Sequence, residues 1–139
     1  MVASSWITRL VRQPADRPES HTHAMTFSML HIVLTAVLTG VVALVVGFLR
    51  LPREHWLDTI AAAVLAGAAV ALWRLSANMP QLNEDGLPGF SANDWAAPAM
   101  TYLFLSGYAD MRPPLLDRQY RQFRILATLG ALAVNVITI

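Results

Sequence analysis

Histidine offers the most specific chemistry in this sequence. His31 lies about six residues into the first long apolar stretch, at membrane depth. Neutral imidazole binds haem iron and the magnesium of a chlorophyll, so His31 is a candidate cofactor ligand. His55 falls at the opposite end of that stretch, so no pair of histidines brackets one haem. We expect no cofactor and a packing role for His31, with haem or pigment ligation as the alternative.

The remaining polar groups make weaker cases for catalysis. His55 lies close to Glu54 and Asp58, an arrangement that resembles an acid–base cluster. Arg50 and Arg53 flank it, however, and a charge-balanced turn at the membrane surface is the simpler interpretation. The chain has no cysteine and no lysine, and it shows no Ser–His–Asp order, glycine-rich phosphate loop or HExxH motif. We therefore expect a protein that is not an enzyme and binds no metal.

Composition indicates the environment of these residues. Of the 139 residues, 55% are hydrophobic and 14% are charged, against roughly 45–50% and about 25% in an average soluble domain. The apolar residues form long blocks, which is typical of membrane proteins. The net charge of +1 gives no reason to expect nucleic-acid binding. All ten basic residues are arginine and alanine is abundant, which points to a GC-rich bacterial genome and hence to the bacterial plasma or inner membrane.

The apolar blocks predict an all-α integral membrane protein with three transmembrane helices. The predicted spans are Met25–Leu49, Trp56–Leu75 and about Phe123–Ile139, since about 20 apolar residues cross the hydrocarbon. Trp95–Tyr108 has only 14 residues and is predicted as a short re-entrant or interfacial helix. If it crosses, the chain has four spans, which is the alternative.

With three spans, the chain divides into five segments. They are a polar N-terminal segment with an interfacial helix (1–24), a transmembrane hairpin (25–75), a polar loop (76–94), a short apolar helix with a Pro-Pro break (95–114) and a C-terminal helix with the third span (115–139).

The distribution of arginine favours three spans, because short cytoplasmic loops carry the excess of positive charge. With three spans and a cytoplasmic N-terminus, eight arginines lie inside and two outside. With four spans and the same N-terminus, four lie inside and six outside, and inverting that arrangement reverses the count. The sequence therefore predicts a multi-pass protein whose N-terminus is cytoplasmic, with the inverted four-span arrangement as its main rival.

Small residues are spaced so that the predicted helices can approach closely, as packing in lipid requires. One stripe includes Gly40 and Gly47 in the first span, and another includes Gly67 and Ala71 in the second. Asn135 in the last span is expected to bond to a neighbouring helix, since an amide in hydrocarbon needs a partner. These stripes predict packing and no particular activity.

The lack of chemistry and the small size of the chain indicate a function through association. We predict a non-catalytic accessory subunit of a larger membrane complex, of respiratory or photosynthetic type by analogy of class. Its partners would be the lipid bilayer and other membrane subunits. Trp95, Arg118 and Arg121 lie in segments expected to contact such subunits. A small homo-oligomeric channel is a third alternative.

Overall fold

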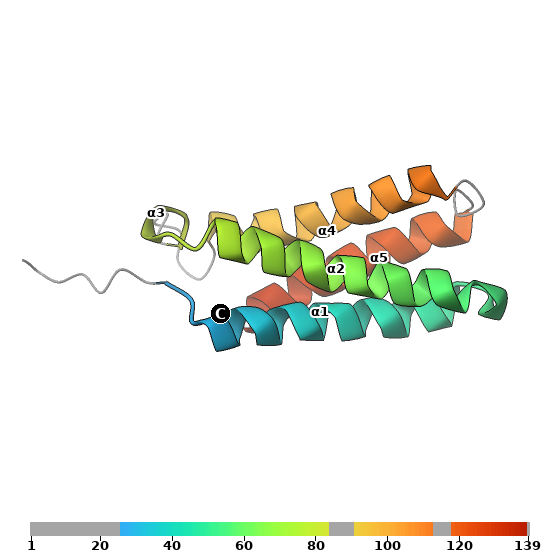
Figure 1. The fold of residues 1–139 in the computed structure, drawn as a ribbon, viewed down its shortest axis with the longest axis horizontal. Helices are drawn as coiled ribbons and strands as arrows, with labels where there is room; N and C mark the ends of the chain where they lie inside the picture. The colour runs from blue at the N-terminus through green and yellow to red at the C-terminus, as the bar shows by residue number, and fades with distance from the viewer. Residues whose placement is uncertain (1–25, 84–90, 113–117, 139) are drawn as a thin grey trace, which may run out of the picture.

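The fold, taken from a computed structural model, is described for residues 26–83, 91–112 and 118–138. This part of the chain is all-helical (Figure 1). Its elements are α1 (Met29–Arg50), the 3₁₀ turn η2 (Arg53–His55), α2 (Trp56–Ser76), α3 (Pro80–Asn83), α4 (Ala92–Met111) and α5 (Arg118–Ile137). The interfacial helix predicted within residues 1–24 lies outside the described residues.

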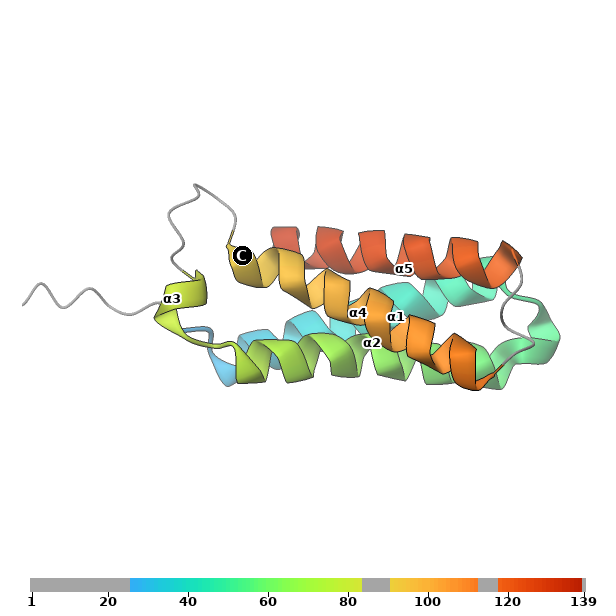
Figure 2. The same cartoon turned by 90° about the horizontal axis from the view of Figure 1, so that it is seen from above.

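The four long helices form an antiparallel bundle in which each packs against two others. The contacting pairs are α1 with α2, α2 with α4, α4 with α5, and α5 with α1, and Figures 1 and 2 show the four helices side by side. At one end α1 and α4 end and α2 and α5 begin. We call this the Arg-rich end, because six arginines lie at or near it: Arg50, Arg53, Arg112, Arg118, Arg121 and Arg124. The opposite end is called the Arg74 end.

The transmembrane hairpin predicted for residues 25–75 corresponds to α1 and α2. The first helix begins later than predicted, at Met29, because Ser28 caps it and its Oγ accepts a hydrogen bond from the His31 backbone nitrogen at 3.2 Å. His31 therefore lies in the first turn of α1, close to the end of the bundle. By length and composition, α1 and the stretch Arg53–Ser76 are apolar enough to cross a membrane.

The prediction of a short helix at Trp95–Tyr108 is wrong. The helix α4 has 20 residues and runs alongside α2 and α5 (Figure 2). The helix begins three residues earlier than predicted, at Ala92, and a capping box stabilises its first turn. In this box the backbone nitrogen and Oγ of Ser91 donate to Asp94 Oδ2 at 2.9 and 2.8 Å. The first and last turns of α4 are polar, so a prediction based on the apolar stretch alone left them out of the helix. With 20 residues α4 is about as long as the other long helices, but it is not among the two described stretches that are apolar enough to cross a membrane.

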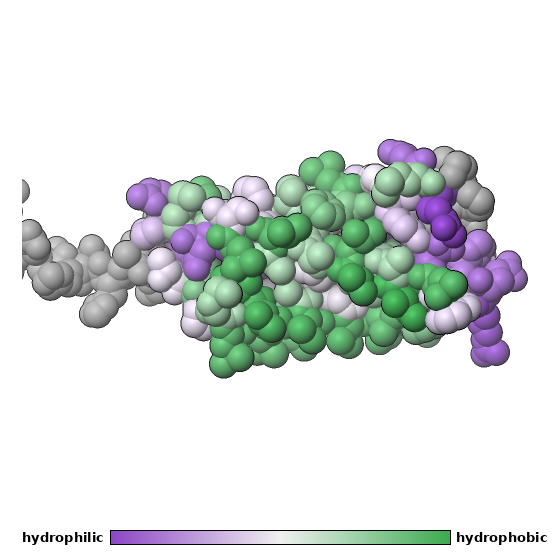
Figure 3. Space-filling view, viewed as in Figure 1, coloured by the Kyte–Doolittle hydropathy of each residue, from purple (hydrophilic) through white to green (hydrophobic). Residues whose placement is uncertain are grey.

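The interior of the bundle combines many small and hydroxyl side chains with a few large apolar ones, of which Ile32, Leu105 and Phe123 are 0–1% exposed. Alanine lines the core on all four long helices, with threonine beside it; fully buried members include Ala43, Ala66, Ala97, Ala127, Thr39 and Thr101. Many large aliphatic side chains lie on the outside, among them Val33, Val37, Val64, Leu72, Leu103 and Leu129. Figure 3 shows one apolar face along α1 and α2. A soluble domain usually buries more of its Leu, Ile and Val side chains than this bundle does.

Candidate functional site

A buried arginine at the Arg74 end lies at the centre of the candidate site. Arg74 is in the last turn of α2, and its side chain is 0% exposed. Its Nη2 forms an ion pair with Asp94 Oδ1 of α4 at 3.0 Å. Its Nε and Nη2 donate to Asn135 Oδ1 of α5 at 3.0 and 2.7 Å. One guanidinium therefore joins three of the four long helices.

Local structure orients both acceptors toward Arg74. The second oxygen of Asp94 is used by the Ser91 cap, which leaves Oδ1 for the guanidinium. The Asn135 amide nitrogen donates to the Ala131 carbonyl at 2.7 Å, which leaves its own oxygen to accept. Because each acceptor is held by its own helix, the ion pair with Asp94 fixes the register of α4 on α2, and the hydrogen bonds to Asn135 fix that of α5.

Phe27 and His31 extend this network to the beginning of α1. The Arg74 Cζ lies 4.5 Å from the centroid of the Phe27 ring, and that ring stacks on His31 with the centroids 4.9 Å apart. Asn78 exchanges two hydrogen bonds of 2.9 Å with the backbone of Phe27, which holds this ring in place. The network thus reaches all four long helices.

Two nitrogen atoms in the network are buried without a hydrogen-bond partner in the described part: His31 Nε2 and Arg74 Nη1. The described residues contain no group of three or more His, Asp or Glu side chains that would hold a metal. A guanidinium stacked on the same ring as His31 also disfavours a metal cation there, because like charges repel. Haem or pigment ligation by His31 stays a prediction.

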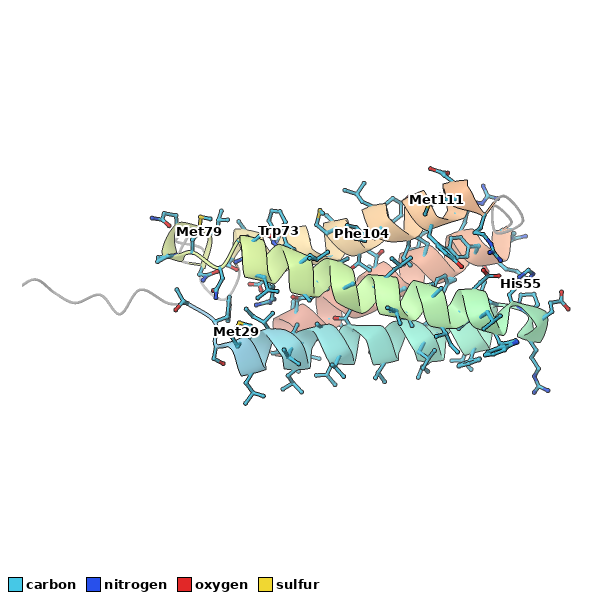
Figure 4. The ribbon with its side chains drawn as sticks, in the orientation of Figure 1. Met29, His55, Trp73, Met79, Phe104 and Met111 are labelled. Carbon is cyan, nitrogen blue, oxygen red and sulfur yellow. The ribbon has the colours of Figure 1, made fainter. Side chains whose placement is uncertain are left out.

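The neighbouring residue, Trp73, closes the same end of the bundle (Figure 4). Its indole Nε1 donates to Asn93 Oδ1 of α4 at 2.8 Å, and the Asn93 amide donates to the Ala77 carbonyl at 3.0 Å. The sequence pattern of Trp73 followed by Arg74 is typical of a membrane interface, where the arginine extends toward water. Arg74 instead turns inward, because Asp94 and Asn135 provide partners there.

A second polar cluster joins α2 and α4 at the Arg-rich end. Asp58 is buried, and its Oδ1 accepts a hydrogen bond from the Tyr108 hydroxyl at 2.6 Å. Arg112 Nη2 lies 3.1 Å from the same oxygen, and His55 Nδ1 lies 3.2 Å from Oδ2. Figure 4 marks His55 at the start of α2. In the sequence Asp58 lies near Arg50 and Arg53, but its arginine partner in the structure is Arg112, which directly follows α4.

Removing the Tyr108 hydroxyl is expected to destabilise the bundle. Tyr108→Phe deletes a short hydrogen bond to a buried carboxylate, which costs about 1.5 kcal/mol of unfolding free energy. The control is Tyr102→Phe, which keeps the ring under the Arg124 guanidinium (Cζ to centroid 4.5 Å) and changes stability by less than about 0.5 kcal/mol. SDS titration in mixed micelles, followed by circular dichroism, measures both. Equal losses in the two variants would contradict the role of the hydroxyl.

Gly40 and Gly67 face each other between α1 and α2. A Cβ on Gly67 would lie 2.9 Å from the Ala36 carbonyl oxygen, and one on Gly40 would lie 3.2 Å from the Ala63 carbonyl oxygen. Gly47 instead faces the core, where a Cβ would lie 2.5 Å from the Thr59 Cγ2. The predicted stripe therefore serves two surfaces: the seam of the hairpin and the contact with the centre of the bundle.

The other predicted contact residues are spread over the bundle. Asn135 is buried against Arg74, while Ala71 is half-buried on α2. Trp95, Arg118 and Arg121 are exposed and lie at opposite ends, Trp95 at the Arg74 end and both arginines at the Arg-rich end. The structure does not bring these three into one surface.

Two features were missed by sequence reasoning. Arg74 and Asp94 lie 20 residues apart on the two sides of a polar loop, and nothing in that spacing indicates a buried ion pair. Gly130 is a contact point of α5 with α1, because a Cβ there would lie 2.5 Å from Val42 Cγ1. Asn135 could have indicated the network from the sequence, because a buried amide requires a hydrogen-bond partner and the Arg74 guanidinium can donate to it.

Comparison with protein-family models, with curated proteins and with solved structures finds no match to this chain. The functional conclusion therefore depends on the site and the surface of the bundle.

Proposed function

We propose that this chain is an integral membrane protein with four spans and serves as a non-catalytic accessory subunit of a larger membrane complex. The observation that carries the proposal is the large number of exposed aliphatic side chains on the long helices, around a core of small side chains, a few large apolar ones and a buried Arg–Asp pair. Such an extensive apolar surface is unfavourable in water but is solvated by lipid tails. The long helices have 20 to 22 residues, and about 20 residues cross the roughly 30 Å of hydrocarbon.

The arginines support an orientation with the Arg-rich end in the cytoplasm. Six of the ten arginines of the chain lie at or near that end, against four on the other side of a four-span arrangement. The one arginine described at the opposite end, Arg74, is buried and paired with Asp94. Short cytoplasmic loops carry the excess of positive charge, so the four-span bundle is inserted with the start of α1 away from the cytoplasm. This orientation is the reverse of the one predicted from sequence, because α4 adds a crossing.

A groove on the outer face of α1 and α2 is where the partner subunit binds. Its volume is about 330 Å³, and its lining is apolar: Ala36, Val37, Gly40, Val41, Leu44, Ile60, Ala63, Val64 and Gly67. Gly40 and Gly67 bring α1 and α2 together at the floor of this groove, so that its base is formed by small residues. The occupant we propose is a transmembrane helix of a larger subunit, because Ala36, Gly40, Ala63 and Gly67 in the lining are the small residues at which membrane helices approach each other closely.

Filling this groove is expected to release the partner. Val64 lines the groove and is 65% exposed in the isolated chain, so Val64→Trp blocks the groove without disturbing the core. The matched control is Leu103→Trp, on α4, where the side chain is 59% exposed. After purification from native membranes in mild detergent, the wild type and Leu103→Trp are expected to retain other polypeptides, whereas Val64→Trp loses them.

Three results would contradict parts of this proposal. A wild-type protein that elutes as a small species of one polypeptide would overturn the accessory role. Retention of the partner by Val64→Trp would overturn the groove as the contact. A visible absorption band in the purified wild type would favour the alternative in which His31 ligates a haem or pigment, and a colourless homo-oligomer would favour a channel.

A further inference from the structure

A second groove, of about 260 Å³, lies between α1 and α5 near the Arg-rich end. It is lined by Arg50, the last residue of α1, and by Gln122, Ile125 and Leu126 of α5. The two polar side chains that donate hydrogen bonds lie nearest the end of the bundle. The two aliphatic side chains lie about one turn farther toward its middle. The lining is therefore amphipathic along the bundle axis, unlike the wholly apolar groove on α1 and α2.

Positive charge is concentrated around this groove. Arg50 is exposed and forms no ion pair in the part of the chain that the structure describes. Arg118 and Arg121 are also exposed, and they precede the lining residues Gln122 and Ile125 by four positions each. Residues four apart share one face of a helix, so both arginines lie on the groove side of α5. Because α5 begins at Arg118, the positive end of its dipole lies at the same level.

The acidic side chains described at this end do little to neutralise that charge. They are Glu54, Asp58 and Asp110, and Asp58 is buried with Arg112 and Tyr108 as its partners. The groove therefore presents guanidinium and amide donors to an anion, and aliphatic carbon to whatever is attached to that anion.

We propose that this groove binds an anionic phospholipid, with the phosphate on Arg50 and Gln122 and an acyl chain on Ile125 and Leu126. A guanidinium donates two parallel hydrogen bonds to a phosphate, and the amide of Gln122 adds another donor. The inference rests on the membrane insertion proposed above, which places the Arg-rich end at the cytoplasmic surface, where anionic headgroups attract basic residues. A free phosphate would satisfy the arginine but would leave the aliphatic half of the groove uncovered.

Native mass spectrometry of the full-length protein in detergent, titrated with phosphatidylglycerol or phosphatidylcholine, tests the site. We expect phosphatidylglycerol to bind the wild type more tightly, and Arg50→Gln to weaken that binding about tenfold, because one charge-assisted interaction is lost. The matched control is Arg53→Gln, which removes the same charge from an exposed arginine at the same end but outside the groove lining. The affinity of Arg53→Gln for phosphatidylglycerol is expected to differ from that of the wild type by less than about twofold.

Each other outcome overturns a stated part of the inference. Equal binding of the two lipids would exclude selection of an anionic headgroup, and equal losses in both variants would show diffuse attraction without a site. Displacement of phosphatidylglycerol by inorganic phosphate at equal concentration would show that the acyl chain contributes nothing. Alkaline carbonate extraction of native membranes separates the two proposals. Release of the protein there would overturn membrane insertion, whereas a retained protein without lipid preference would overturn only this site.

Discussion

Arg74→Met is expected to lower the unfolding free energy of the bundle by about 3–5 kcal/mol. The substitution keeps an unbranched side chain of similar length but leaves the carboxylate of Asp94 buried without its ion-pair partner. It also removes both hydrogen bonds to Asn135. Breaking a buried pair on one side is costly because a lone charge remains in a medium of low dielectric. SDS titration in mixed micelles measures the loss.

A double substitution identifies the source of this destabilisation. In Arg74→Met with Asp94→Asn, no charge remains at the site, and the amide oxygen still accepts from the Ser91 cap. We therefore expect the double variant to recover part of the stability lost in Arg74→Met. The control is Arg53→Met, an exposed arginine of η2, with a change of less than about 0.5 kcal/mol. If Arg74→Met behaves like Arg53→Met, the ion pair does not hold the helices together.

Local sequence was sufficient for the hairpin of α1 and α2. The apolar runs are long, the turn at Pro52 breaks them, and the glycines Gly40 and Gly67 recur on the faces that meet. Each of these signals depends on residues within a few turns of one another. The structure differs mainly at the start of the first helix, where the Ser28 cap determines the first residue.

The start of α4 is a local signal, because Ser91 followed three residues later by Asp94 offers a helix N-cap, and the structure has a capping box there. The burial of Arg74 required tertiary information. Arg74 reads as interfacial because its partners lie 20 and 61 residues away in sequence. The predicted topology stays a prediction, because an arginine count depends on knowing how many helices cross. A charged residue near the end of an apolar run can lie in water or inside the bundle, and only its partners decide between the two.

Gly67→Ala is expected to destabilise the bundle by about 1–3 kcal/mol, because the added methyl group overpacks the seam between α1 and α2. The new Cβ would lie 2.9 Å from the Ala36 carbonyl oxygen, a backbone atom that no rotamer change can move. Gly40→Ala is expected to cost less, since its Cβ would lie 3.2 Å from the Ala63 carbonyl oxygen. The two helices must separate in both variants, and the greater separation belongs to Gly67→Ala.

The matched control is Gly107→Ala in α4, where a Cβ would meet nothing within 4 Å. There the substitution only removes the backbone freedom of glycine, so stability should rise by about 0.5–1 kcal/mol. The expected order of stability is therefore Gly107→Ala above wild type, then Gly40→Ala, then Gly67→Ala, in one SDS titration series. Equal effects at positions 67 and 107 would show that the close approach of α1 and α2 is absent in the folded protein. We expect stability to fall in Gly67→Ala and to rise in Gly107→Ala, because the backbones of α1 and α2 are in contact at Gly67 and leave no space for a methyl group.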